Sequence, residues 1–317
     1  MSLPKICIPD DAPPVMGPSA AYRTLLERTT PVYYDSLPGA EDRLIERIGD
    51  ARIVINIRSS SKFTARVFDS CPNLKMLSLW GTGTDNVDLI SAARAGITVT
   101  NTPGVAAIAI AEHCLMLMLA VARRILEVDR LVRQGQWPRA QVAQMHGKTL
   151  GVIGLGAIGR QFAKVAAGIG MNVISWTMHP KPELGFRHVE LDELFRASDV
   201  VSLHLRQSPE TIKFLTQRHF DLMKPSAIFL NTARGPIAEE SALVDALRSR
   251  RIAGAGLDVF ETEPLAPGHP LTQLDNVVLT PHSAGATPET LEAGLRLSIE
   301  NVFDWLAARP SHVVAAP

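Results

Sequence analysis

Three short segments of the chain place an arginine, a glutamate and a histidine after apolar runs of the kind that form buried strands. These residues are Arg234, Glu263 and His282. Reducing a 2-keto acid requires a cation for the carboxylate and the carbonyl, and a proton donor for the developing alkoxide. Arg234 suits the first role and His282 the second, while Glu263 could hold the imidazole and favour its charged form. Each residue alone is more often part of an ordinary turn, so the hypothesis rests on their combination.

A glycine pattern between an apolar run and a helical pattern predicts a dinucleotide site. Gly154, Gly156 and Gly159 follow the apolar run 149–153 with the spacing G-x-G-x-x-G. One glycine permits the tight turn, one lets the backbone approach a pyrophosphate, and one lets helix and strand pack closely. The phosphates would then lie at the N-terminus of the helix. The order strand, glycines, helix makes this interpretation much stronger than the motif alone.

The acidic residue that normally binds the ribose of NAD is missing. Thr177 occupies its expected place at the end of the strand predicted over 172–176. A carboxylate there binds the ribose 2′-hydroxyl, and its charge would repel the 2′-phosphate of NADP. His179, Lys181 or Arg206 could instead attract that phosphate. We expect NAD as the cofactor and leave NADP open.

These residues need a frame of strands that alternate with helices. Short apolar runs separated by helical patterns predict βα units on parallel sheets. The expected strands cover residues 5–8, 32–34, 52–57, 74–79 and 97–100 in a first set, and 149–153, 172–176, 199–203, 227–231, 254–259 and 276–279 in a second.

Three helices are marked by their sequences. One is expected over 88–95, because Gly96 suits its C-terminal end. A single long helix is expected over 105–134, buried where it is apolar and exposed from Arg123 onward. The last helix begins at Thr287, an N-cap residue followed by a proline, and could cross back onto the first domain with no strand after it.

The composition is that of an ordinary two-domain protein. The 317 residues include 32 basic and 32 acidic ones without a charge block, which gives no support to binding of nucleic acid or membrane surfaces. The three cysteines have no metal-ligand spacing and suit a reducing cytoplasm. The N-terminus lacks the apolar core of a signal peptide. The apolar run 114–122 has about half of the roughly 20 residues that span a bilayer.

Nearly the whole chain resembles the D-isomer-specific 2-hydroxyacid dehydrogenases, which include D-lactate, D-glycerate, glyoxylate/hydroxypyruvate and D-3-phosphoglycerate dehydrogenases. The resemblance is carried by the segments described above and by residues 54–59, 81–88, 101–104 and 111–113. It implies an NAD(P)-dependent enzyme that interconverts a small 2-keto acid and its D-2-hydroxy acid. It also implies two Rossmann-like or flavodoxin-like α/β domains with parallel sheets, the site in the cleft between them, and a homodimer.

The same resemblance assigns residues to roles. Residues 1–102 and 287–317 would form the substrate domain, and residues 103–286 the NAD(P)-binding domain. The catalytic set would be Arg234, Glu263 and His282. The cofactor-binding residues would be Gly154, Gly156, Ala157, Ile158, Gly159, Thr177, Thr232, Ala233, Asp258 (at the nicotinamide end) and Gly285. The substrate-binding residues would be Arg58, Trp80, Gly81, Thr82 and Gly83, the last three through backbone N–H groups.

Departures from the family pattern bear on the substrate. Leu79 and Trp80 stand where phosphoglycerate enzymes resemble Arg-Ala, so a phosphate partner is missing and an unphosphorylated, glyoxylate- or hydroxypyruvate-like substrate is favoured. Arg58 is the nearby cation that keeps D-3-phosphoglycerate dehydrogenase as the alternative. The end of the chain at Pro317 leaves no room for the regulatory domain of some such enzymes.

Three further features bear on the cofactor and on the function. Residues 205–208 replace a Pro-Leu-Thr-like stretch, which leaves the adenosine side of the cofactor site open. Formate dehydrogenases share the fold but pair their histidine with glutamine, and Glu263 argues against that chemistry.

An alternative of another class is an NAD(H)-sensing transcriptional corepressor, which would keep the same three residues. The sequence lacks the long tails that such proteins carry.

Overall fold

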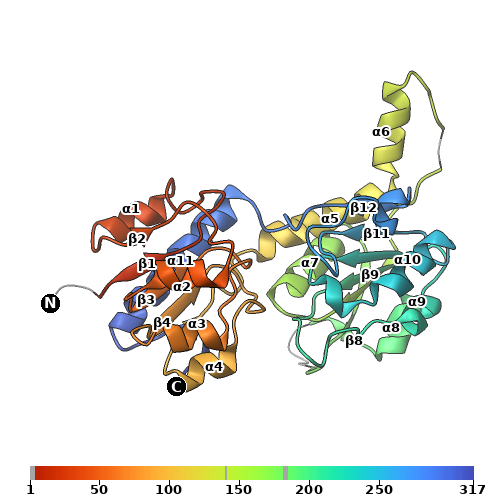
Figure 1. Cartoon of the computed structure of the whole chain (residues 1–317). Coiled ribbons are helices and arrows are strands. Elements are labelled where there is room, and N and C mark those ends of the chain that lie inside the picture. The colour runs from red at the N-terminus through yellow and green to blue at the C-terminus, as the bar shows by residue number, and fades with distance from the viewer. Residues whose placement is uncertain (1–3, 140, 181–184) are drawn as a thin grey trace. The chain divides into compact units, whose positions relative to one another are not determined.

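The chain forms two compact units (Figure 1) in a computed structural model that describes residues 4–139, 141–180 and 185–317. Unit 1 runs to Ala106 and resumes at Thr287, and unit 2 runs from Ala107 to Ala286. The sequence predicts the first boundary slightly earlier, at residue 102, and the second at the same place. The roles of the two units stay a prediction.

Unit 1 contains a six-stranded sheet in the order β13-β5-β4-β3-β1-β2. Its parallel strands are β1 (Ile6–Ile8), β2 (Val32–Tyr33), β3 (Ile53–Asn56), β4 (Met76–Leu79) and β5 (Thr98–Thr100). The expectation that no strand follows the last helix is wrong, because β13 (Val313–Ala315) pairs antiparallel with β5. This short segment covers the otherwise unpaired edge of β5, a role that its own sequence does not signal.

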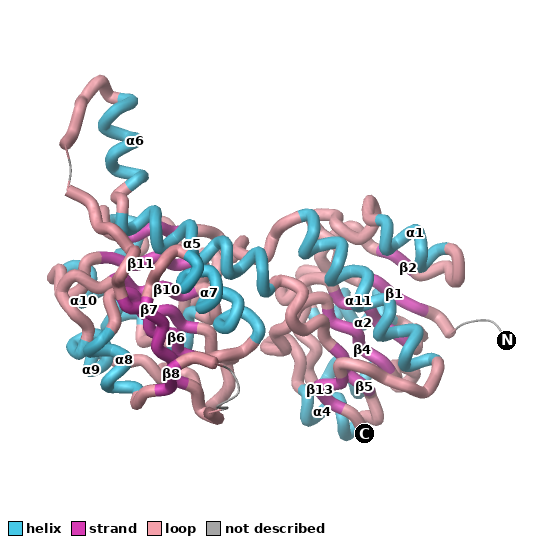
Figure 2. The backbone as a smooth tube through the Cα atoms, turned by 180° about the vertical axis from the view of Figure 1, so that it is seen from behind, coloured by secondary structure: helices cyan, strands magenta, loops and turns pink. Residues whose placement is uncertain are grey.

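Helices cover both faces of this sheet. The helices α1 (Ala20–Leu26) and α11 (Pro288–Leu306) share a core with Ile53 and Ile55 on one face, and Figure 2 shows α11 lying across the strands. On the opposite face, Val54 packs in a second core. The helices on that side are α2 (Glu41–Ile48), α3 (Ala65–Ser70) and α4 (Leu89–Arg94).

Unit 2 contains a seven-stranded sheet in the order β12-β11-β10-β9-β6-β7-β8, and every pairing in it is parallel. The strand order reverses between β6 and β9, which makes their carboxyl ends the expected ligand site of such a sheet. The strands are β6 (Thr149–Ile153), β7 (Asn172–Trp176), β8 (Arg187–His188), β9 (Val200–Leu203), β10 (Ile228–Asn231), β11 (Gly254–Leu257) and β12 (Val277–Leu279). The two-residue β8 has no apolar run and was not predicted.

Two layers of helices enclose the unit 2 sheet. On one face, α5 (Ala107–Ala122) and α7 (Ala157–Gly168) bury their apolar sides against β6. The opposite face packs against helices of its own, which are α8 (Leu191–Ala197), α9 (Gln217–Leu222) and α10 (Glu240–Arg248).

The single helix expected over 105–134 is wrong. The chain breaks at Arg124, whose left-handed backbone (φ 49°) ends α5 and starts α6 (Ile125–Arg133). No residue of α6 is buried, and in Figure 1 the helix stands away from the body of unit 2. The break was missed because an arginine, not a glycine, adopts the left-handed conformation. None of the described helices is long and apolar enough to cross a membrane.

Candidate active site

The glycine pattern forms a turn at the switch point of the unit 2 sheet. Gly154 follows β6 with φ 96°, and a Cβ there would lie 2.7 Å from the carbonyl oxygen of His204, just beyond β9. At Gly159 a Cβ would lie 2.1 Å from the Gly154 oxygen, so helix and strand pack too closely for a side chain. Gly156, the N-cap of α7, is exposed, and a Cβ there would meet nothing within 4 Å. The fold requires glycine at Gly154 and Gly159, whereas the space beside Gly156 is free for a ligand.

This turn fits the pyrophosphate of a dinucleotide. The first N–H groups of α7 have no partner within the helix and lie at the positive end of its dipole. Ala157 is exposed beside Gly156, and Ile158 is half-buried. Thr177 follows β7 directly, at the strand end where the ribose-binding residue is expected, and it is half-buried. Lys181, one of the expected partners of a 2′-phosphate, lies outside the described residues.

The strand ends beyond β10, β11 and β12 are tied together by backbone hydrogen bonds. The N–H of Asp258 donates to Asn231 (2.9 Å), and the N–H of His282 donates to Asp258 (2.8 Å). Gly235 packs so tightly on this edge that a Cβ would lie 1.9 Å from the carbonyl carbon of Phe260. The segments that carry Arg234, Glu263 and His282 are therefore held side by side, as the sequence predicts.

Glu263 and His282 are in direct hydrogen-bond contact. Nδ1 of His282 lies 2.7 Å from Oε2 of Glu263, and the other carboxylate oxygen accepts the N–H of Phe260 (3.0 Å). The His282 side chain is 44% exposed, so the ring edge opposite Nδ1 can meet a ligand. Partial burial acts to raise the pKa of Glu263. The His282 and Phe260 hydrogen bonds and the charges of His282 and Arg234 outweigh it, so the pKa lies below its usual value.

The loop of His282 is held by a buried carboxylate that sequence reasoning assigned only to the cofactor. Asp258 is 1% exposed, and its Oδ1 accepts the Thr280 hydroxyl (2.6 Å) and the Ser283 N–H (2.9 Å). Its Oδ2 accepts the N–H of Ala284 (2.9 Å). These contacts hold His282 in a left-handed conformation, with φ 52°. The structure therefore gives Asp258 a positioning function for this loop.

A second histidine joins this network. Nε2 of His113, on α5, lies 2.9 Å from the Thr280 hydroxyl and 3.6 Å from Oδ1 of Asp258. Burial lowers the pKa of His113, against the opposing charge of Asp258. In the sequence, His113 belongs to one of the segments that carry the family resemblance, 111–113. Its position on an apolar helix gave no sign of this contact.

The remaining cofactor-binding candidates lie at the same sheet edge. Thr232 and Ala233 follow β10, and the Thr232 hydroxyl lies 3.2 Å from the sulfur of Cys114. Burial raises the pKa of that thiol to about 12, so it stays protonated. Gly285 follows the loop of His282 and is half-buried.

In unit 1, the loop Gly81–Gly83 follows β4 and is held by the segment after β5. The N–H of Gly81 donates to the Thr102 hydroxyl (2.7 Å), and the N–H of Thr102 donates to the Gly81 carbonyl (2.9 Å). Within the described residues, the N–H groups of Thr82 and Gly83 donate no hydrogen bond. Of the three amides expected to meet a carboxylate, two are therefore available and the first is engaged.

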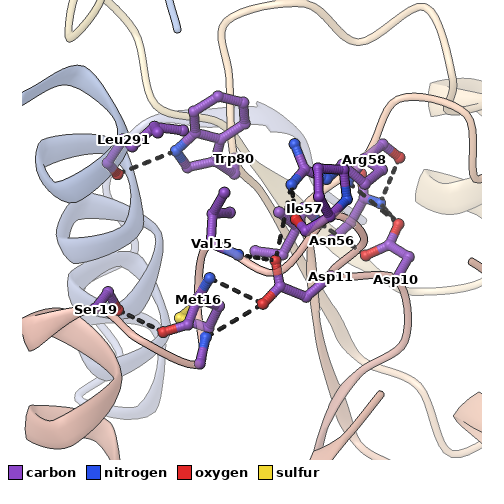
Figure 3. Close-up of polar contacts among 12 residues, drawn as sticks. Asp10, Asp11, Val15, Met16, Ser19, Asn56, Ile57, Arg58, Trp80 and Leu291 are labelled. Atoms are coloured by element: carbon purple, nitrogen blue, oxygen red, sulfur yellow. Dashed lines mark hydrogen bonds and ion pairs between the residues drawn. The ribbon is translucent and has the colours of Figure 1, made fainter. Parts of the chain in front are cut away.

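Trp80 and Arg58 lie at the same edge of the unit 1 sheet, where Figure 3 shows their contacts. The Trp80 indole donates to the Leu291 carbonyl (3.4 Å) and packs on Gly294 of α11, where a Cβ would lie 2.4 Å from Nε1. Arg58 is turned toward the β1 end, where its Nη2 donates to the Pro13 carbonyl.

Comparison with known proteins decides the family. Residues 115–284 match the NAD binding domain of the D-isomer specific 2-hydroxyacid dehydrogenases. A glyoxylate reductase of Korarchaeum cryptofilum is 38% identical over 282 residues, which cover 86% of this chain and 85% of that protein. The chain is a member of the D-isomer specific 2-hydroxyacid dehydrogenase family. It is thus an NAD(P)-dependent oxidoreductase of 2-keto and 2-hydroxy acids.

Two other relatives show the breadth of this family. A D-3-phosphoglycerate dehydrogenase of Archaeoglobus fulgidus is 40% identical over 278 residues, which cover 86% of this chain but 52% of that protein. Among solved structures, an acyclic imino acid reductase in complex with NADPH and D-Arg has a TM-score of 0.91 and 33% identity. That match covers 98% of this chain and 99% of the other. The family thus includes enzymes that act on different substrates.

Proposed function

We propose that the enzyme reduces a small, unphosphorylated 2-keto acid, such as glyoxylate or hydroxypyruvate, to the D-2-hydroxy acid. The observation that carries the reaction is the 2.7 Å pair of His282 and Glu263, beside a third segment that bears Arg234. His282 would donate the proton to the alkoxide, Glu263 would hold the imidazole and stabilise its charge, and Arg234 would bind the carboxylate and polarise the carbonyl.

The cofactor would bind along the carboxyl edge of the unit 2 sheet. Gly154, Gly156, Ala157, Ile158 and Gly159 would cradle the pyrophosphate. Thr177 would meet the adenosine ribose. Thr232, Ala233, Asp258 and Gly285 would face the nicotinamide half. When bound, the reduced nicotinamide supplies the hydride.

Unit 1 would bind the carboxylate of the substrate through the free amides of Thr82 and Gly83. The residue types beside them favour an unphosphorylated substrate, because neither Leu79 nor Trp80 supplies a positive charge for a phosphate. Burying a phosphate dianion against apolar groups costs several kcal/mol unless a charge compensates it. Arg58 is the candidate cation for such a phosphate.

The test is a kinetic comparison with both cofactors. We expect oxidation of NADH, or of NADPH, when glyoxylate or hydroxypyruvate is added, and a lower kcat/KM for phosphohydroxypyruvate at equal concentration. A higher kcat/KM for the phosphorylated compound would favour the alternative, D-3-phosphoglycerate dehydrogenase. Binding of NAD(H) without turnover of any keto acid would instead favour the NAD(H)-sensing corepressor.

We further propose that the enzyme works as a cytoplasmic homodimer. The three cysteines are buried and free, as suits a reducing compartment. On α6 and the segment after it, Leu126 is 59% exposed, Val132 45% and Trp137 82%. Exposed apolar side chains on a projecting arm fit a second copy of the chain. Light scattering should give twice the chain mass of 34.4 kDa, and a monomer would refute the proposal.

A further inference from the structure

Two carboxylates are buried after β1, at the edge of the unit 1 sheet that carries Arg58 and Trp80. The side chains of Asp10 and Asp11 are wholly buried. Asp10 accepts the N–H groups of Ile57 (2.9 Å) and Arg58 (3.3 Å), and so holds the backbone that carries the Arg58 side chain. Reduction of a keto acid requires neither carboxylate.

Asp11 holds the loop that faces the Arg58 side chain. Its Oδ1 accepts the N–H of Val15 (2.8 Å), and its Oδ2 accepts the N–H of Met16 (2.9 Å) and the hydroxyl of Tyr33 (2.7 Å). Nη2 of Arg58 lies 3.9 Å from Oδ1 of Asp11. Figure 3 shows Asp11 between the loop amides and Arg58. The guanidinium is thus turned toward a buried anion.

The cluster of Arg58, Asp10 and Asp11 has no excess positive charge for a second anion. Arg58 carries one positive charge and Asp11 one negative charge, and Asp10 adds a further negative charge whenever it is ionised. The Arg58 side chain is only 21% exposed, so solvent screens the pair less than it screens a surface pair. A keto acid with one carboxylate can be satisfied by N–H donors, whereas the additional charge of a phosphate is bound more strongly where a cation has no anionic partner of its own.

We propose that Asp11 is a specificity-determining residue. By offsetting the charge of Arg58, it restricts the enzyme to keto acids with a single negative charge and disfavours those with a phosphate. The inference rests on the proposed function, because it takes Arg58 and the loop after β4 as the substrate-binding part of unit 1.

The experiment measures kcat/KM for phosphohydroxypyruvate and for hydroxypyruvate in Asp11→Asn. Asparagine removes the charge and keeps one of the two oxygen acceptors, while its amide nitrogen cannot accept the hydrogen bonds made to the other oxygen. We expect the ratio of kcat/KM for phosphohydroxypyruvate to kcat/KM for hydroxypyruvate to rise about tenfold or more. This is the size of effect that an opposite charge within a few ångströms has on a charged group. The rise should shrink in high salt. Tyr33→Phe is the matched control, because it removes one hydrogen bond to Asp11 without a change of charge, and its ratio should equal that of the wild type.

A double-mutant cycle with Arg58→Gln completes the test. In Arg58→Gln the charge of Asp11 is uncompensated, so the ratio should fall below the wild-type value. Asp11→Asn should then restore the ratio toward wild type but no higher. An unchanged ratio in a folded Asp11→Asn protein would overturn the inference. If that variant does not fold, an unchanged or higher ratio in Arg58→Gln overturns it.

These outcomes are distinct from failure of the proposed function. That function is tested by the wild-type enzyme alone, which should prefer hydroxypyruvate. A wild type that prefers the phosphorylated compound removes the proposed substrate class. A wild type that prefers hydroxypyruvate, with an insensitive Asp11→Asn variant, removes only the role of Asp11.

Discussion

The two sheet edges that carry the candidate residues are built from different chemical groups. The edge of unit 2 presents ionisable side chains, with His282 and Glu263 paired and partly exposed. The edge of unit 1 presents backbone amides after β4, while its carboxylates, Asp10 and Asp11, are buried and engaged with the backbone. Proton transfer needs groups that gain and lose charge, whereas recognition of a carboxylate needs only fixed donors. Changes to His282 and Glu263 of unit 2 should therefore lower kcat, and changes to the loop after β4 in unit 1 should raise KM.

The largest expected effect is that of Arg234→Ala. Loss of a charged donor that acts in the transition state typically lowers the rate by about 10²–10³, so kcat/KM should fall by at least this factor. Arg234→Lys should restore part of it, because lysine keeps the charge but not the planar pair of donors. Arg248→Ala, which removes an exposed arginine of α10, is the matched control and should match the wild type. Near-wild-type activity of the alanine variant would remove Arg234 from the mechanism.

Gly156→Ala and Gly159→Ala should separate cofactor binding from folding. A Cβ at Gly156 meets open space, so the variant should fold normally but bind NAD(H) at least about tenfold more weakly, by obstructing the pyrophosphate. At Gly159 a Cβ meets the Gly154 backbone at 2.1 Å, so the free energy of unfolding should fall by about 1–3 kcal/mol. The measurements are Tm without cofactor and a fluorescence titration with NADH. Equal effects of the two substitutions on both quantities would contradict this division of roles.

The pH profile of Glu263→Gln tests the contact of Glu263 with His282. The carboxylate orients the imidazole, so the variant should reduce keto acids more slowly at neutral pH, and the difference from the wild type should shrink as pH falls and Glu263 takes up a proton. The lowered pKa of Glu263 adds a stability effect. A depressed carboxyl pKa contributes stability above the unfolded value of about 4.3, and this is lost as pH falls through the folded value. The Tm difference between wild type and variant should therefore be present at neutral pH and shrink in acid. Superimposable rate profiles would show that Glu263 is not the partner of His282.

The candidate site residues that the sequence could predict are those whose proposed chemistry belongs to the side chain. Arg234, Glu263 and His282 each follow an apolar strand, and a parallel sheet brings such strand ends to one edge. The order of strands and helices could also be predicted, because most of the strands are apolar runs. The contacts of Asp258 and His113 were not visible, because they depend on which loop folds back over the strand ends.

Unit 1 was harder to interpret because its candidate groups for substrate binding are backbone amides. Whether an amide is free depends on its partners, and nothing in the sequence indicates that Thr102 engages the N–H of Gly81. Asp11 stands in a Pro-rich stretch that sequence patterns identify only as a loop. Its contact with Arg58 joins residues far apart in the chain, which a local pattern cannot predict. β13 was missed for a similar reason, because its pairing with β5 joins distant parts of the chain. Arg124 was missed because a residue other than glycine adopts the left-handed conformation there.

The smallest expected effect is that of Thr102→Val, which tests the unit 1 edge. Valine has nearly the shape of threonine but cannot accept the N–H of Gly81, so that amide loses its 2.7 Å partner and the loop after β4 loosens. Because Thr82 and Gly83 follow directly, KM for the keto acid should rise about three- to tenfold, equivalent to roughly 1 kcal/mol for one hydrogen bond, while kcat stays within about twofold. Thr102→Ser keeps the hydroxyl and should match the wild type. A fall in kcat with unchanged KM would show that this loop acts in the chemical step, and the contrast between the two edges would then be wrong.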